Sequence, residues 1–326
     1  MKHWLFALLG VLAIAPTASA HTLVTPDRIM RAQNNLTYTG LMVINGVQRV
    51  RIFHGPGMQL RQEYLNPAGQ LADLLLSDGQ TRWHYSPADK LVSVTPLEPP
   101  VSTDERLSLL KQNYDFQVLG EGRRANRPVV IARFVPHHAG NLVHLLWVDE
   151  ATCLPLAVER RDGSGALVDR SEYTTIHFNP TFRDQDFRFN VPMGCHVVST
   201  LTMLAHGNPQ TPTPADPRFH PQPPRAVPPG YALVSWQLFM SNNHVRTFDW
   251  RYHDGLNPLS VFAVQADSQA RVPSEAKTVQ VDGHPAYLLD NEGEHLLMWT
   301  AQGTAYTAVG HLPEADLEHV ADSTYR

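Results

Sequence analysis

The stretch LLWVDEATCLPLAVERRDGSGALVDRSEY (residues 145–173) decides the fold class. Apolar and polar residues alternate in it, as they do in paired antiparallel strands, and a polar Asp-Gly turn interrupts the alternation. Its first strand, residues 141–149, is apolar on both faces: one carries Val143, Leu145 and Trp147, and the other carries Leu142, Leu146 and Val148. A strand of an antiparallel sheet that is apolar on both faces is covered on both faces. The sequence therefore predicts a sheet with something packed on each side.

The residues around this stretch predict more strands of the same kind. Segments such as TYTGLMVI, QRVRIFHG and MQLRQEYL have the length of strands and are separated by Gly, Asn, Asp or Pro. We expect residues 21–205 to form one antiparallel sheet of roughly ten strands, and a sheet of this width curls because strand twist accumulates. The predicted fold class is α+β, with an N-terminal half-open antiparallel β-barrel.

Two short helices are predicted to accompany this barrel. Thr25 is a suitable N-cap and Pro26 a suitable first helical residue, so the first helix runs to about Asn35. The second helix has Ser102 or Thr103 as its cap and acidic residues in its first turn. A curled sheet has a concave face that must be filled. We expect the two helices to cap part of that face.

A segment dense in proline, residues 206–229, separates this region from the rest of the chain. Proline lacks a backbone donor and fixes φ, so the segment is predicted to be a semi-rigid, extended linker. Residues 230–326 contain several strand-length segments and one C-terminal helix that Pro313 opens. This pattern predicts a smaller C-terminal α+β domain, in which a helix packs on an antiparallel sheet.

Residues 1–20 have the composition of a secretory signal peptide. Lys2 and His3 precede an apolar run, and the segment ends in Thr17-Ala18-Ser19-Ala20. The run is too short for a membrane span, which needs about 20 apolar residues. We expect cleavage near Ala20 and an exported mature chain.

Charge and cysteine content narrow the range of partners and cross-links. The net charge of −5 without a basic block argues against a nucleic-acid partner. Cys153 and Cys195 are the two cysteines of the chain. An exported protein can join such a pair in a disulfide, and the sequence leaves open whether it does.

The chain carries no recognisable catalytic motif. It has no G-x-S-x-G turn, no H-E-x-x-H helix and no P-loop. His137, His138 and His144 are not spaced with carboxylates or thiolates in the way that metal ligands are. We therefore expect a protein that is not an enzyme and that uses no metal and no cofactor.

Aromatic and aliphatic residues that share strand faces give a binding hypothesis instead. A curled sheet encloses its concave face, and apolar side chains there can line a cavity for an acyl chain. The predicted lipid-binding set consists of Trp83, Tyr85, Val143, Leu145 and Trp147. The sequence does not say which face is concave, so the alternative set is Leu142, Leu146 and Val148. An ordinary core beneath a helix is the alternative to a cavity.

Several segments resemble the RseB/MucB family of periplasmic regulators. RAQNNLTYTGLMVI, NYDFQVLGEGRRANRPVVIARFVP and NLVHLLWVDEATCLPLAVERRDGSGALVDRSEYTTIHF resemble the first domain of that family. The block from PPGYALVSWQLF to HLLMWTAQGTAYTAVGHLPEADLEHVA resembles its C-terminal domain. The phrase LWVDEATCLPL is also widespread in the wider fold shared with the LolA and LolB lipoprotein carriers. The resemblance covers nearly the whole mature chain.

The resemblance implies both a fold and a function. It implies a LolA/LolB-like half-open barrel with a hydrophobic concave face, and a second domain in contact with it. It further implies a periplasmic regulator of the sigma-E type stress response, which binds the periplasmic segment of a membrane-bound anti-sigma factor and shields it from proteolysis. Lipid-like envelope components would relieve that protection. The alternative function is a periplasmic lipid or lipoprotein carrier, and a homo-oligomer is compatible with either.

Overall fold

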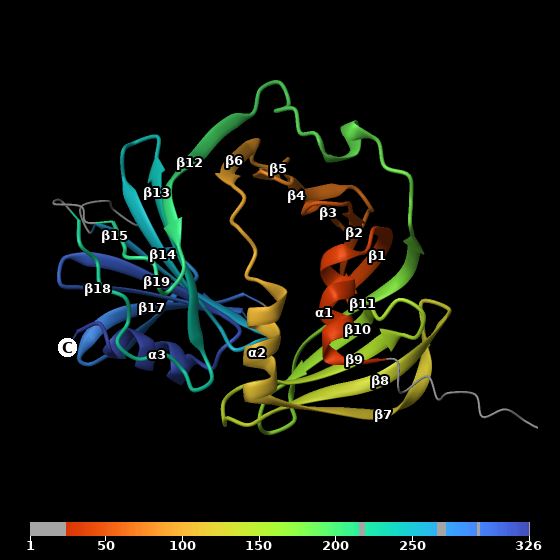
Figure 1. Ribbon diagram of the computed structural model, residues 1–326. Helices are drawn as coiled ribbons and strands as arrows, with labels where there is room; N and C mark the ends of the chain where they lie inside the picture. The colour runs from red at the N-terminus through yellow and green to blue at the C-terminus, as the bar shows by residue number, and fades with distance from the viewer. Residues whose placement is uncertain (1–23, 215–218, 266–271, 292–293, 326) are drawn as a thin grey trace, which may run out of the picture.

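The computed structural model describes residues 24–214, 219–265, 272–291 and 294–325, and the predicted signal peptide lies outside them. The described residues form nineteen strands and three α-helices. Most of the chain is antiparallel sheet, arranged as two curled sheets that share one strand (Figure 1). The predicted α+β class with a half-open barrel is therefore confirmed.

The N-terminal sheet is an open barrel. The first and last strands of its antiparallel run, β6 and β7, do not pair with each other within the described residues. Each strand pairs antiparallel with its neighbours in the order β6 (Leu91–Pro96), β5 (Thr81–Ser86), β4 (Leu71–Asp78), β3 (Gln59–Leu65), β2 (Gln48–His54), β1 (Tyr38–Ile44), β11 (Leu167–Phe178), β10 (Pro155–Arg161), β9 (Val143–Asp149), β8 (Arg127–Pro136) and β7 (Tyr114–Arg124).

The stretch that decided the fold class supplies β9, β10 and β11. Trp147 pairs with Ala157 across β9 and β10. The turn before β11 depends on Asp162, whose Oδ1 accepts hydrogen bonds from the backbone N–H groups of Ser164 (2.9 Å) and Ala166 (3.0 Å). Gly165 supplies the positive φ of 86° that this turn requires. Local turn chemistry thus fixes the register of the apolar strand that precedes it.

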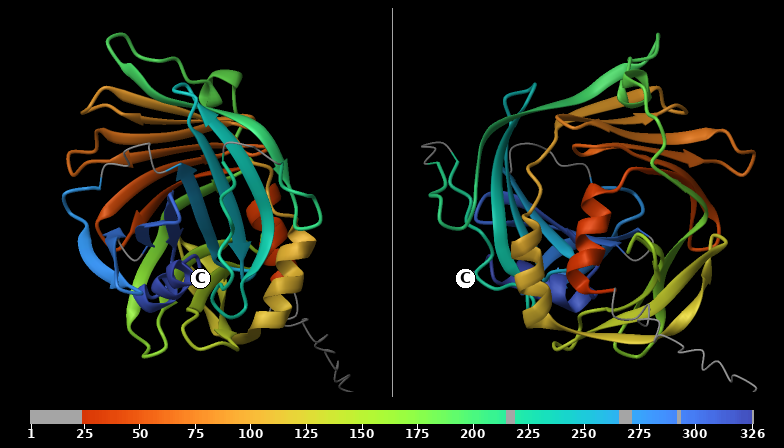
Figure 2. Two further views of the ribbon diagram at one scale, coloured as in Figure 1. Left: turned by 90° about the vertical axis from the view of Figure 1, so that its left-hand side faces the viewer. Right: turned by 45° about the vertical axis from the view of Figure 1, so that its right-hand side comes forward.

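Two helices, α1 (Pro26–Asn35) and α2 (Thr103–Asn113), lie side by side in the concavity of this sheet (Figures 1 and 2). Thr25 caps α1 and Ser102 caps α2, each by accepting a backbone N–H bond. Asn34 donates a hydrogen bond to the Thr103 hydroxyl (3.0 Å) and so joins the two helices. The helices cover the concave face, as the sequence predicted.

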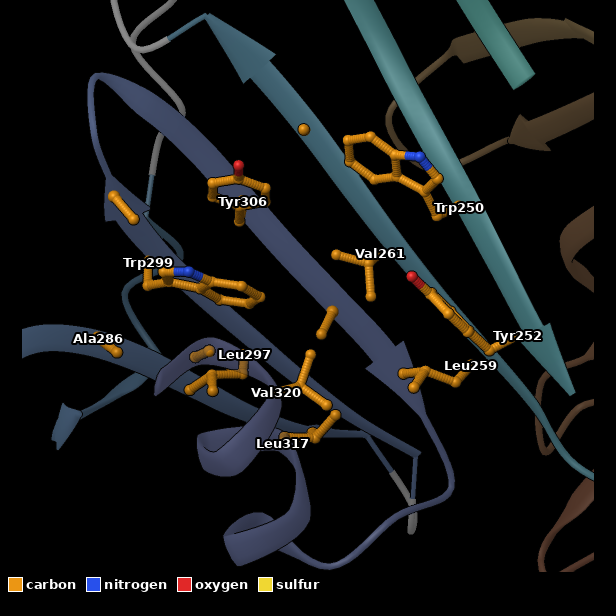
Figure 3. Close-up of a cluster of buried hydrophobic side chains, with 14 of the residues drawn as sticks. Trp250, Tyr252, Leu259, Val261, Ala286, Leu297, Trp299, Tyr306, Leu317 and Val320 are labelled. Atoms are coloured by element: carbon orange, nitrogen blue, oxygen red, sulfur yellow. The ribbon is translucent and has the colours of Figure 1, made fainter. Parts of the chain in front are cut away.

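The C-terminal sheet packs its own helix, α3 (Glu314–Asp322), on one face. Figure 3 shows the apolar core between them, in which Leu317 and Val320 of α3 face Leu297 and Val261 of the sheet. The strands follow the order β12 (His196–Gly207), β13 (Ala232–Ser241), β14 (Arg246–His253), β15 (Pro258–Gln265), β19 (Thr304–Gly310), β18 (Glu294–Ala301), β17 (His284–Asn291) and β16 (Lys277–Val281).

Strand β12 belongs to both sheets. Residues 196–200 pair parallel with β6, and residues 201–207 pair antiparallel with β13. The domain boundary expected at residue 205 therefore falls inside a strand. The proline-rich segment that follows connects β12 with β13, which are neighbours in one sheet. Trp236 Nε1 donates to the Thr211 carbonyl (3.0 Å), and the Tyr306 hydroxyl donates to the Gln222 carbonyl (3.1 Å), so this segment is attached to the C-terminal sheet.

A buried polar cluster joins the two halves of the chain where α2 ends. Asp254, which is fully buried, accepts hydrogen bonds from the Tyr114 hydroxyl and from Asn257 Nδ2. Asn113 Nδ2 donates to the carbonyls of Asp254 and Gly230, both at 2.8 Å. The Asp254 carboxylate, the Tyr114 hydroxyl and the Asn113 amide are thus paired between the two halves, while Asn257 Oδ1 has no partner among the described residues. These hydrogen bonds favour one relative position of the two halves.

Candidate ligand-binding groove

The concave face of the N-terminal sheet is not completely filled by the helices. Three neighbouring cavities lie along it beside α1, and Gln33 lines all three. We call them together the inner groove, and separately the apolar, mouth and junction compartments. Their volumes are about 330, 610 and 250 Å³ respectively. Cavities of this size take up small ligands or parts of larger ones.

The apolar compartment lies on β1, β2, β3, β10 and β11. The side chains that line it are mainly aliphatic and aromatic, and they include Tyr38, Met42, Ile52, Leu60, Leu156 and Tyr173. Tyr38 stacks on His54, with ring centroids 4.9 Å apart, and meets Tyr173 edge-on at 5.8 Å. Burial raises the pKa of Tyr38 above its ordinary value. These rings form a rigid wall that an acyl chain can contact without any hydrogen bond.

The mouth compartment joins this wall to the loop between β6 and α2, residues 97–102. His54 and Leu60 are shared with the apolar compartment, and Ser77 and Arg82 extend the lining along β4 and β5. The loop contributes Leu97, Pro100, Val101 and Ser102. A change in the position of this loop would therefore change access to the inner groove.

The junction compartment has a polar wall and reaches the C-terminal half through Leu256. Arg160 forms an ion pair with Asp169 (2.7 Å), and His144 lies beside them with 7 % of its surface exposed. Burial, followed by the charge of Arg160, lowers the pKa of His144 to about 3, so the imidazole is neutral. Burial also lowers the pKa of Arg106, which Asp254 partly opposes. This end of the groove suits a polar or hydroxyl-bearing group.

The structure places the predicted set of five residues on the face opposite the helices. Leu146 and Val148 form a buried cluster with Ile29 of α1 and Leu107 of α2, so Trp147 between them points to the outer face. There the Arg124 guanidinium lies over the Trp147 ring, 4.6 Å from its centroid. Val143 and Leu145 alternate with Trp147 and share its face. The sequence had left open which face is concave. Trp147 shares a buried cluster with Leu156 and Tyr173, which line the apolar compartment, so its part in lipid binding stays a prediction.

Trp83 and Tyr85 also lie on the outer face. Arg82 lines the mouth compartment, so its neighbour Trp83 points away from it. The Phe189 ring covers both, at centroid distances of 6.1 Å from Trp83 and 5.8 Å from Tyr85. The structure thus brings Trp83 and Tyr85 together under the connection that follows β11. It does not bring them to the inner groove.

The alternative set contains the residues on the helix side. Leu146 and Val148 pack against α1 and α2, and Leu146 also lines the junction compartment. Leu142 is buried just before β9 but is not part of that cluster. The groove residues that the sequence argument missed, such as Met42 and Ile52, alternate within the strands TYTGLMVI and QRVRIFHG. That alternation was visible in the sequence, but nothing tied it to the concave side.

Cys153 and Cys195 are not joined by a disulfide in this structure. Cys153 is buried in the cluster beneath the helices, and burial raises its pKa. Cys195 Sγ lies 4.0 Å from the Tyr85 hydroxyl on the outer face. Because they occupy different faces of the sheet, the bridge that the sequence left open is not formed. In the described part of the chain, no three His, Cys, Asp or Glu side chains gather as a metal site would require. No helix of that part is long and apolar enough to span a membrane.

The described residues form an open barrel with an inner groove, and a second curled sheet that shares strand β12 with it. The family model for the MucB/RseB N-terminal domain matches residues 26–191, just over half of the chain. The chain therefore belongs to the MucB/RseB family, as the sequence resemblance predicted. No curated protein matches the chain.

Solved structures of MucB have a similar fold over nearly the whole of this chain. The complex of Pseudomonas aeruginosa MucA/MucB is 20 % identical with a TM-score of 0.58, covering 94 % of this chain and 98 % of that chain. MucB alone is 20 % identical with a TM-score of 0.57, covering 94 % and 98 %. MucB in complex with MucA(peri) is also 20 % identical with a TM-score of 0.57, covering 91 % and 96 %.

Proposed function

We propose that this chain is a non-catalytic periplasmic regulator, which binds the periplasmic segment of a membrane anti-sigma factor and senses lipid-like ligands in its inner groove. The observation that carries the proposal is the shared two-domain fold with MucB, a protein whose structure is known in complex with MucA(peri). Membership of the MucB/RseB family supports the same assignment. The signal-peptide composition of residues 1–20 supports export to the periplasm.

The partner segment gives the first test. The mature chain from His21 is mixed with the periplasmic segment of the anti-sigma factor from the same organism, and binding is measured by calorimetry. We expect a stoichiometric complex in which the segment resists proteolysis. A chain that leaves the segment unbound, and that instead recovers acylated proteins from envelope extract, would establish the alternative of a lipid or lipoprotein carrier. That alternative is kept because an apolar groove alone suits both functions.

The lipid ligand gives the second test. Leu60 lines both the apolar and the mouth compartments and is only partly buried, so a charge there should be tolerated by the fold. The wild type should bind a fluorescent fatty acid that an unlabelled fatty acid displaces. We expect Leu60→Glu to abolish this binding. Val47→Glu is the matched control, because Val47 is 77 % exposed in the turn between β1 and β2. Equal binding by both variants would exclude the inner groove as the lipid site.

A further inference from the structure

An ion pair joins the loop between β6 and α2, residues 97–102, to the C-terminal sheet. Glu98 of the loop contacts Arg251 of β14, with an oxygen-to-nitrogen distance of 2.7 Å. The loop lines the mouth compartment on one side. On its other side it lines a separate cavity of about 400 Å³ that is bounded by Ser235, Trp236 and Gln237 of β13. The ion pair therefore sets the position of a wall shared by two cavities.

A second carboxylate lies beside this ion pair. Asp249 precedes Arg251 by two residues in β14, so both side chains lie on the face of the sheet that looks toward the loop. Asp249 is 1 % exposed, and neither carboxylate oxygen has a hydrogen bond of good geometry from the described residues, although the Ser260 side chain of β15 lies close to it. A buried carboxylate without a partner is strongly disfavoured in its charged form. Asp249 must therefore carry a proton or take Arg251 as its own partner.

The groups around Asp249 decide between these two states. From the loop, Glu98 repels the charged form; from β14, Arg251 favours it; from β15, Ser260 also favours it. Gln237, which is opposite on β13, is uncharged. Two titratable side chains line the same cavity: His206 of β12, which pairs with Gln237, and Glu105 of α2. His253, two residues beyond Arg251 in β14, has its pKa lowered to about 3 by burial and by two arginines, and so stays neutral. Burial is the largest influence on Asp249 and raises its pKa to about 7.

We propose that Glu98, Asp249 and Arg251 form a proton-dependent latch between the 97–102 loop and the C-terminal sheet. With Asp249 protonated, Arg251 is available to Glu98 and the loop is held. When Asp249 loses its proton, the carboxylates of Asp249 and Glu98 compete for the Arg251 guanidinium. Asp249 is favoured in this competition, because it lies on the same strand as Arg251. Glu98 is then repelled and the loop is released, so that the mouth compartment and the neighbouring cavity change shape together.

The direction of the pH effect follows from the raised pKa of Asp249. A carboxyl with a higher pKa in the latched state than in water stabilises that state while it is protonated. The latch is therefore held at acidic pH and released as pH rises through about 7. This device depends neither on the identity of the partner nor on lipid binding, so it can fail without affecting the proposed function.

The Trp236 indole N–H reports on the latch, because Trp236 lines the cavity beside the loop. Its NMR cross-peak is followed from pH 5.5 to 8.5 in the full mature chain and assigned with Trp236→Phe. We expect a transition with its midpoint at about pH 7 in the wild type. Asp249→Asn should abolish the transition and keep the low-pH position, because asparagine reproduces the neutral side chain. In Glu98→Gln the Trp236 cross-peak should stay at its high-pH position over the whole pH range, because the ion pair with Arg251 is lost.

Asp104→Asn is the matched control, because the Asp104 side chain is 89 % exposed on α2 close to the same loop. It should titrate as the wild type does. Circular dichroism at each pH separates loop release from unfolding. A transition that persists in Asp249→Asn, a wild type without any transition in this range, or Glu98→Gln at the low-pH position would each overturn the proposal.

Discussion

Removal of the Tyr114 hydroxyl tests whether the buried polar cluster unites the two halves of the chain. This hydroxyl donates to Asp254 and accepts from Asn257 Nδ2 (3.0 Å), and burial raises the pKa of Tyr114 well above its ordinary value. Tyr114→Phe leaves Asp254 fully buried with three remaining donors, from Asn257 Nδ2 and from the backbone N–H groups of residues 256 and 257. A hydrogen bond to a charged group contributes about 1.5–3 kcal/mol. We expect the free energy of unfolding to fall by that amount.

Differential scanning calorimetry measures this loss directly. A loss of about 1.5–3 kcal/mol lowers Tm by about 3–12 °C for a domain of ordinary size. Because the cluster connects the halves, the wild type should unfold in one transition and the variant should show a broader or split one. Tyr287→Phe is the control, since the partly buried Tyr287 hydroxyl has no hydrogen bond to the described residues, and its change in unfolding free energy should be below about 0.5 kcal/mol. Equal Tm values for wild type and Tyr114→Phe would refute this account of the junction.

Three further outcomes are expected. Trp147→Glu should destabilise the fold by about 3–5 kcal/mol in a urea titration, because the ring is 8 % exposed beneath Arg124; a well-folded variant that loses fatty-acid binding would instead return the lipid site to the outer face. Gly255→Ala should lower the free energy of unfolding by more than about 1 kcal/mol, because φ is +109° and a Cβ would lie 2.4 Å from a backbone nitrogen of α2. An unchanged midpoint of urea unfolding would contradict this close approach. Stability should fall as pH drops from about 6.5 toward 4, since the pKa values of buried His144 and His253 are lowered to about 3 and the unfolded chain takes up their protons. Asp249, whose pKa is raised to about 7, cancels one of these two protons, so the net slope should be about 1.4 kcal/mol per pH unit. In His144→Gln one histidine remains against Asp249, and the slope should nearly vanish.

The sequence predicted those elements whose signals are local. The caps at Thr25 and Ser102, the Asp162 turn and the strand alternation all act within a few residues, and each element is where it was expected. The proline-rich segment shows the limit of composition. Its residues cannot enter a central strand, but composition does not say where the flanking strands go. In the structure they are neighbours, β12 and β13, and the segment returns along the sheet they belong to.

The junction of the two halves could not be predicted, because its parts are far apart in the chain. Tyr114 and Asp254 are separated by 140 residues, and neither occurs in a recognisable motif. Each looks ordinary in sequence: an aromatic residue at the end of a helix, and an aspartate in a turn. The same holds for Glu98 and Arg251, which meet only because β12 carries the chain from one sheet to the other.

The choice between the two faces of β9 shows why a binding site was harder to predict than the fold. Both faces are apolar and both Trp147 and Leu146 are buried, so burial alone does not say which of them faces the concave side. Concavity is decided by the sign of the curl and by which face receives α1, and both depend on contacts between the strand and a helix more than 100 residues earlier. One polar residue carries the missing information. His144 shares the face of Leu146, and a histidine facing a core must meet a cavity or a polar partner. In this structure that cavity is the junction compartment, so the buried histidine marks the concave face that the apolar residues leave undecided.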